Sequence, residues 1–234
     1  MAFTFLVKSV VGFGGPLLAI PMLAPFIGVE HAVVAVSLGN IVANLMLLWA
    51  NRDAAGTTMP LLVRVVSAGI IGVAGGTYLL TVLDDRILSI ALAISVFLYI
   101  VLALARPDVR LSRDRGLRIA APVGVVGGFM HGATGNSGMV FGTYLHALDL
   151  PRREFVFAVT IPFLAFGTVQ VFTLAGLGGF DGARLVQALF AILPVLVVTP
   201  LGSRIGDRLK TQTFSRLVLA LLALSGVFLI AAAI

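Results

Sequence analysis

Two short glycine-rich stretches interrupt long apolar segments, and they are the first candidates for chemistry. Gly12–Gly15 reads GFGG and Gly135–Gly138 reads GNSG. Such a density of glycine is unfavourable inside a helix, so we expect the helix to break at both places. A helix that begins after a break carries about half a positive charge at its N-terminus and offers free N–H groups. The two breaks therefore predict a site for an anion.

Six residues of the breaks are candidate substrate-binding residues. Asn136 and Ser137 can donate hydrogen bonds to anion oxygens, or alternatively they can cap the helix that follows. Glycines let an anion come close to the backbone because they lack a side chain. The glycines with this role are Gly12, Gly14, Gly15 and Gly138.

A second group of polar candidates follows each break by about 25 residues. Ser37 and Thr160 can contact substrate, or each hydroxyl can bond a carbonyl of its own helix. Asn40 and Asn44 share a helix face with Ser37, one turn apart. A buried amide is costly in lipid, so we expect these amides, and less strongly Gln170, to line a cavity or join helices.

Two ionisable residues, Lys8 and His131, each precede a glycine break by four positions. Ionisable groups inside membranes are functional candidates by default. We therefore expect them to attract an anion or to couple transport to protons. The alternatives are that Lys8 extends its amine to the membrane surface and that His131 is a neutral structural imidazole. No Asp or Glu lies in the middle of a predicted span, so a carboxylate proton relay is not expected.

The composition indicates that a membrane surrounds these residues. The chain has 234 residues, 59% hydrophobic and 11% charged, whereas soluble domains carry about 25% charged residues. The net charge of +6 comes from basic residues between apolar runs, which fits loops at a lipid surface better than nucleic-acid binding. Cysteine is absent, which excludes disulfides and thiolate sites. We expect no cleaved signal peptide, no metal and no cofactor.

Eight apolar segments account for most of the chain. Two contain the breaks, Met1–Phe26 and Arg118–Leu148, and the others have the length of about 20 residues that a bilayer core of about 30 Å requires. The six ordinary spans are His31–Ala50, Pro60–Leu83, Ile87–Ala105, Phe155–Ala175, Arg184–Ser203 and Thr213–Ile234.

The two halves of the chain repeat each other. An ungapped offset of 123 residues places Gly12 on Gly135 and the run 35–38 (AVSL) on the run 158–161 (AVTI). Chance similarity between apolar stretches is the alternative, but the spacing from break to helix is kept. Internal repeats with paired interrupted segments are typical of secondary transporters. We divide the chain into a first repeat, 1–110, and a second, 111–234.

Charge distribution selects between two topologies. If both broken segments cross the membrane, nine basic residues lie on one side and seven on the other. If each segment enters and returns on one side, the counts are thirteen and three, a strong positive-inside signal. The second arrangement is favoured, although 118–134 is long for half a membrane. The expected fold is an all-α polytopic membrane protein with two inverted repeats, each of one re-entrant broken segment and three transmembrane helices.

At these motifs the chain resembles the sulfite exporter TauE/SafE family, also called the toluene-sulfonate uptake permeases. The family has two copies of a glycine break, a proline-containing stretch and an Ala-Val-Ser/Thr helix start, seen here at 12–21 with 35–38 and at 132–138 with 158–160. The second copy lacks the full glycine triplet and the proline. The resemblance implies a multi-pass inner-membrane transporter of sulfite, sulfonate or a related organosulfur anion, and it leaves a homodimer open.

Three other functions are weighed against a transporter. The sequence around Ser137 is similar to the Gly-x-Ser-Gly of intramembrane serine proteases, but that chemistry needs a histidine from another helix. None of the three histidines, His31, His131 on the same limb and His146, is expected to be well placed for it, so an enzyme is not expected. An anion channel and a non-transporting scaffold are the remaining alternatives, and the chain has almost none of the large soluble loops that a scaffold would favour.

Overall fold

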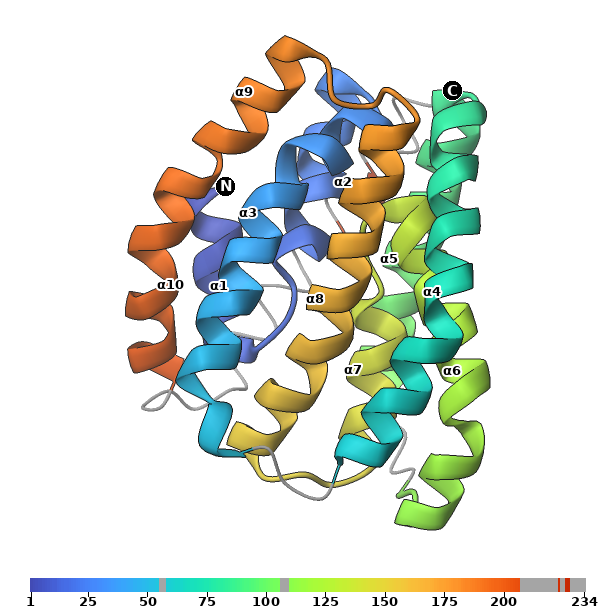
Figure 1. Cartoon of the computed structure of the whole chain (residues 1–234), viewed down its shortest axis with the longest axis vertical. Helices are drawn as coiled ribbons and strands as arrows, with labels where there is room; N and C mark the ends of the chain where they lie inside the picture. The colour runs from blue at the N-terminus through green and yellow to red at the C-terminus, as the bar shows by residue number, and fades with distance from the viewer. Residues whose placement is uncertain (55–57, 106–109, 207–222, 224–225, 228–234) are drawn as a thin grey trace.

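The computed structural model describes residues 1–54, 58–105, 110–206, 223 and 226–227 (Figure 1). Over these residues the fold consists of α-helices, one short 3₁₀ turn at Arg52–Ala54 and connecting loops. The helices are α1 Ala2–Val11, α2 Gly15–Ile27, α3 Val29–Ala50, α4 Met59–Val82, α5 Asp85–Ala105, α6 Arg113–Thr134, α7 Gly138–His146, α8 Arg152–Gly176, α9 Gly182–Phe190 and α10 Ile192–Gly206.

Five helical stretches in the described residues are long and apolar enough to cross a membrane. They are α3, α4, most of α5, α8, and α9 together with α10. They coincide with five of the six ordinary spans predicted from the sequence, and the sixth lies mostly outside the described residues. The all-α, multi-pass membrane fold is therefore confirmed.

The helix boundaries repeat at the offset found in the sequence. Four helix boundaries in the first half recur 123 residues later. The end of α1 corresponds to the end of α6. The starts of α2, α3 and α4 correspond to the starts of α7, α8 and α9. Contacts repeat as well. The Cβ position of Gly12 lies against Val156, and that of Gly135 lies against Val33, which is the same pair of positions with the two halves exchanged.

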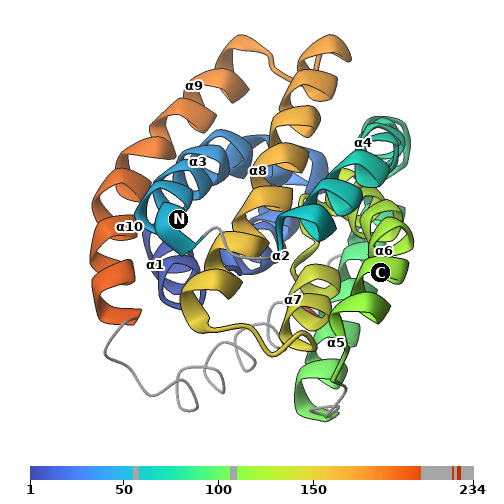
Figure 2. The ribbon, with the colours of Figure 1, turned by 60° about the horizontal axis from the view of Figure 1, so that its bottom comes forward.

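The two helices α3 and α8, which correspond under the offset of 123, run in opposite directions. Glu30, at the start of α3, pairs with Arg184 at the start of α9 over 2.8 Å. At the other end of α3, Arg153 near the start of α8 donates to the carbonyl of Ala50 over 3.3 Å. The equivalent helices α3 and α8 therefore lie antiparallel, as two inverted repeats require (Figure 1, Figure 2).

The second broken segment, α6 with α7, is a hairpin that returns to the end at which it begins. The backbone N–H of Leu111, before α6, donates to the carbonyl of Ala147, after α7, over 2.7 Å. The hydroxyl of Tyr144 donates to the carbonyl of Gly116 over 2.8 Å. Arg118 and Arg152 therefore belong to segments that begin at the same end, and the eight-crossing arrangement requires opposite ends. The long first limb predicted from sequence is present: α6 has 22 residues and α7 has nine.

Most basic residues come from the segments at the end where α4, α6 and α8 begin and α10 finishes (Figure 1). Arg64 of α4 donates to the carbonyl of Leu117 of α6, which joins two of these segments. The opposite end has Arg86 and Arg184. The described basic residues of the richer end are Arg52, Arg64, Arg110, Arg113, Arg115, Arg118, Arg152, Arg153 and Arg204.

A close backbone contact fixes α6 to α4. The two helices run parallel, and successive glycines of each face the backbone of the other, so that a Cβ on α6 would collide with a carbonyl oxygen of α4. Small residues allow such close packing of helices in lipid, where van der Waals contact replaces the hydrophobic effect. The colliding pairs are Gly124 with Val65, Gly128 with Gly69, and Gly132 with Val73.

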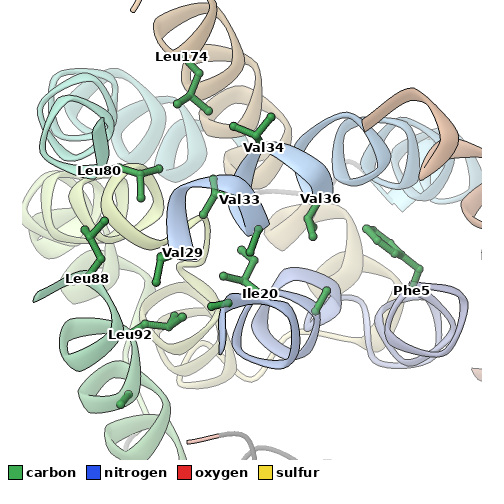
Figure 3. Close-up of a cluster of buried hydrophobic side chains, with 14 of the residues drawn as sticks. Phe5, Ile20, Val29, Val33, Val34, Val36, Leu80, Leu88, Leu92 and Leu174 are labelled. Carbon is green, nitrogen blue, oxygen red and sulfur yellow. The ribbon is translucent and has the colours of Figure 1, made fainter. Parts of the chain in front are cut away.

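An apolar cluster holds the first broken segment, α1 with α2, in the bundle (Figure 3). Side chains of α3 and α5 surround Ile20 of α2, and Phe5 of α1 lies at the edge of the same cluster. Its buried members include Val29, Val33 and Val36 of α3 and Leu88 and Leu92 of α5. The cluster therefore positions α1 and α2, and with them the first glycine break.

Candidate functional site

Lys8 is a buried cation in the middle of the bundle. Its side chain on α1 is 1% exposed, and its Nζ donates to Oδ1 of Asn40 on α3 over 2.6 Å. The same Nζ lies 5.4 Å from the ring centroid of Phe163 on α8. No ion pair in the described part of the chain includes Lys8. One amide and one ring face compensate this charge only partly, because burying an ammonium removes its hydration.

His131 lies close to the C-terminal end of α6 and is also 1% exposed. Its Nδ1 is 3.1 Å from Oγ of Ser137, which is fully buried in the second break. When Ser137 donates to Nδ1, the ring proton is on Nε2. Nε2 has no partner among the described residues. In that tautomer the imidazole presents one unused N–H donor to the interior of the bundle.

The two candidate cations share one aromatic neighbour. The ring centroids of His131 and Phe163 are 6.1 Å apart. Nζ of Lys8 lies 5.4 Å from the centroid of the same Phe163 ring. The offset of 123 relates Lys8 to His131 and Asn40 to Phe163, so the contact of Lys8 with Asn40 corresponds to that of His131 with Phe163. The site is thus built twice from equivalent positions, with an amide in one copy and a phenyl ring in the other.

The first glycine break, Gly12–Gly14, needs glycine for backbone reasons. Gly12 has a φ of 95° and Gly14 a φ of 109°, both in the left-handed region that other residues rarely adopt. Gly15 then begins α2, and a Cβ there would lie 3.0 Å from Cδ of Lys8. The break therefore brings the start of α2 directly against the buried lysine.

The starts of α2 and α7 lie close together. The Cβ position of Gly138, the first residue of α7, is 3.3 Å from the ring of Phe13, which belongs to the first break. The start of α2 follows Phe13 by two residues. The N-terminal N–H groups and positive dipole ends of two short helices thus occur in one region of the bundle, as an anion site requires.

Several predicted site residues use their polar groups within the protein. Oδ1 of Asn136 accepts the N–H of Gly138 over 2.9 Å and so caps α7. Oγ of Ser37 donates to the carbonyl of Val34 over 2.8 Å. Oγ1 of Thr160 donates to the carbonyl of Val156 over 2.6 Å. With its one proton engaged, neither hydroxyl donates to an anion in this geometry.

Gln170 and Asn44 have different surroundings. Nε2 of Gln170 donates to the carbonyls of His131 and Gly132 over 2.9 and 3.0 Å, and so satisfies groups freed where α6 ends. Asn44 is fully buried, and both atoms of its amide lack partners among the described residues. Phe13 and Phe163 were not predicted as site residues from the sequence. The repeat gives a signal for Phe163, since the offset of 123 relates it to Asn40.

The expectation that no histidine is well placed at hydrogen-bond distance from Ser137 is wrong. His131 precedes Ser137 by six residues on the same segment, but the chain turns at Gly135, which has a φ of 68°, and brings the two side chains to hydrogen-bond distance. Both residues are buried. A serine and a histidine in contact are not by themselves a protease site, and the His131 ring packs here between Phe163 and Phe166.

Comparison with known proteins identifies the family. No curated protein and no solved structure matches the chain. The model of the family described as sulfite exporter TauE/SafE matches residues 1–229 of the 234. Members of this family are membrane transporters rather than enzymes, in agreement with the five apolar membrane-length helices and the paired breaks. The chain belongs to the sulfite exporter TauE/SafE family of membrane transporters.

Proposed function

We propose that this protein is a secondary transporter that moves sulfite, or a closely related small sulfonate, across the inner membrane of a cell. The observation that carries the proposal is a buried ammonium, Lys8, that has no carboxylate partner in the described residues and contacts the same Phe163 ring as His131, whose Nε2 is unpartnered there. Such a pair favours a bound anion, because the anion supplies the missing counter-charge.

The helix termini support the same conclusion. Gly15 and Gly138 begin two short helices that approach each other through Phe13. Broken helices whose N-termini point at an anionic group are the usual substrate site of secondary transporters, at the interface of inverted repeats. The polar residues around this point are buried on every side, so transport requires the two halves to move apart on one side at a time.

The orientation and assembly belong to the same proposal. The end with nine described basic residues faces the cytoplasm, following the excess of Lys and Arg in cytoplasmic loops. The repeats divide at about residue 110, and the transporter functions as a monomer or a homodimer with lipid around it. The substrate-contacting set proposed here comprises the predicted break residues with Lys8, Asn40 and His131.

Counterflow in proteoliposomes tests the function. Vesicles loaded with unlabelled sulfite should accumulate radiolabelled sulfite when the purified protein is present, and empty vesicles should not. A parallel screen with thiosulfate, short sulfonates, sulfate and small carboxylates ranks the substrates. The absence of counterflow for every sulfur anion would refute the proposal. If the anion enters but its internal concentration never exceeds the value at electrochemical equilibrium, the protein is a channel instead.

A further inference from the structure

Gly167 of α8 leaves a small space beside the two buried donors. A Cβ at this position would lie 3.6 Å from Cγ1 of Ile41, 3.9 Å from Nδ2 of Asn40 and 3.9 Å from Nε2 of His131, with no closer neighbour. Gly167 is itself buried. The absence of one side chain therefore leaves a position that two nitrogen donors from different helices face.

Both donors are prepared for an acceptor at that position. Nε2 of His131 has no partner in the described residues, and it carries the ring proton in the tautomer in which Ser137 donates to Nδ1. Asn40 accepts from Lys8 through Oδ1, so its Nδ2 hydrogens point away from the lysine and remain available. An oxygen in van der Waals contact with the Cα of Gly167 lies beyond the Cβ position, and the two nitrogens are the polar atoms nearest to that position.

The repeat shows that this position exists once. The residue equivalent to Gly167 under the offset of 123 is Asn44, which carries a side chain where Gly167 has none. Under the same offset the two donor residues, Asn40 and His131, correspond to Phe163 and Lys8. The combination of a glycine with these two donor side chains therefore occurs in one half, whereas the equivalent positions of the other half hold an amide, a phenyl ring and a lysine.

We propose that Gly167 is a specificity-determining residue of the transporter, and that one oxygen of a compact oxyanion binds against its Cα between Asn40 and His131. This inference rests on the proposed function and adds the position and size limit of the substrate. The space admits one oxygen, so the rest of the anion enters only as neighbouring side chains part. A three-oxygen anion of the size of sulfite needs a small displacement, and an aryl sulfonate needs a much larger one.

Gly167→Ala tests the inference because the added methyl fits without a collision. Its nearest neighbour is at 3.6 Å, which is ordinary contact, so the variant should fold. The methyl fills the oxygen position, and sulfite should bind at least about tenfold more weakly, measured by calorimetry in detergent and as KM in counterflow. Gly176→Ala is the matched control on the same helix, since nothing lies within 4 Å of its Cβ position.

The outcomes separate the two proposals. If the wild type and Gly176→Ala transport sulfite and Gly167→Ala does so with the same KM, Gly167 does not border the substrate and the inference is refuted while the function stands. If the wild type transports no sulfur oxyanion, the function itself is refuted. Should Gly167→Ala not fold, the wild-type protein with selenite, a heavier oxyanion of the same shape, gives the answer: the selenium density must lie against Gly167, and density elsewhere overturns the inference.

Discussion

Replacement of Lys8 by methionine isolates the contribution of the buried charge. Methionine has a similar length and no charge. The ammonium is 2.6 Å from Oδ1 of Asn40, and an anion oxygen on the other atom of the same amide is therefore about 7 Å from Nζ. At an effective dielectric constant of about 20 the attraction over this distance is about 2 kcal/mol. Loss of that attraction should weaken anion binding about thirtyfold.

The assay is sulfite binding by calorimetry together with the concentration dependence of counterflow. Lys8→Met should raise Kd and KM about thirtyfold. It also leaves Oδ1 of Asn40 without its donor, which costs roughly 1–3 kcal/mol of stability, so thermal unfolding is measured in parallel. Arg86→Met is the control: this arginine is exposed at the start of α5, where salt screens its charge. A folded Lys8→Met protein whose Kd is within about threefold of wild type would show that Lys8 does not face the substrate.

Three further perturbations test the topology, the first break and the glycine contact. Cysteines introduced singly at Arg110 and Arg153 should both resist external thiol reagents in intact cells and react after permeabilisation; external labelling of only one would contradict the hairpin. Gly15→Leu should abolish counterflow while the protein stays in the membrane, because the leucine side chain displaces Lys8. Gly75→Leu is the control and should transport normally, since nothing lies within 4 Å of its Cβ position. Normal counterflow by Gly15→Leu would show that the first break does not border the substrate. Gly128→Ala should lower stability by roughly 1–3 kcal/mol because its Cβ collides with the α4 backbone, and a melting temperature equal to that of a Gly75→Ala variant would disagree.

The sequence by itself determined that lipid surrounds the protein and that its two halves are similar. An apolar composition with few charges is stable only where lipid covers the surface, so the membrane class follows without any tertiary information. The breaks are equally local, because Gly12 and Gly14 adopt a backbone conformation that few other residues tolerate. Once the breaks are located, their constant distance from the next helix start is enough to align the halves and to relate Lys8 to His131.

The tertiary structure decided which polar groups are free. The residue type alone does not tell whether Asn136, Ser37 and Thr160 bind a substrate or a backbone group. In the structure Asn136 accepts a backbone N–H, and the two hydroxyls donate to carbonyls of their own helices. The approach of His131 to Ser137 depends on how the chain turns at Gly135, and the space at Gly167 depends on the distance between α3 and α8. Periodicity and spacing describe one segment at a time, whereas a binding position is defined by atoms of several helices, and their separation is set by packing.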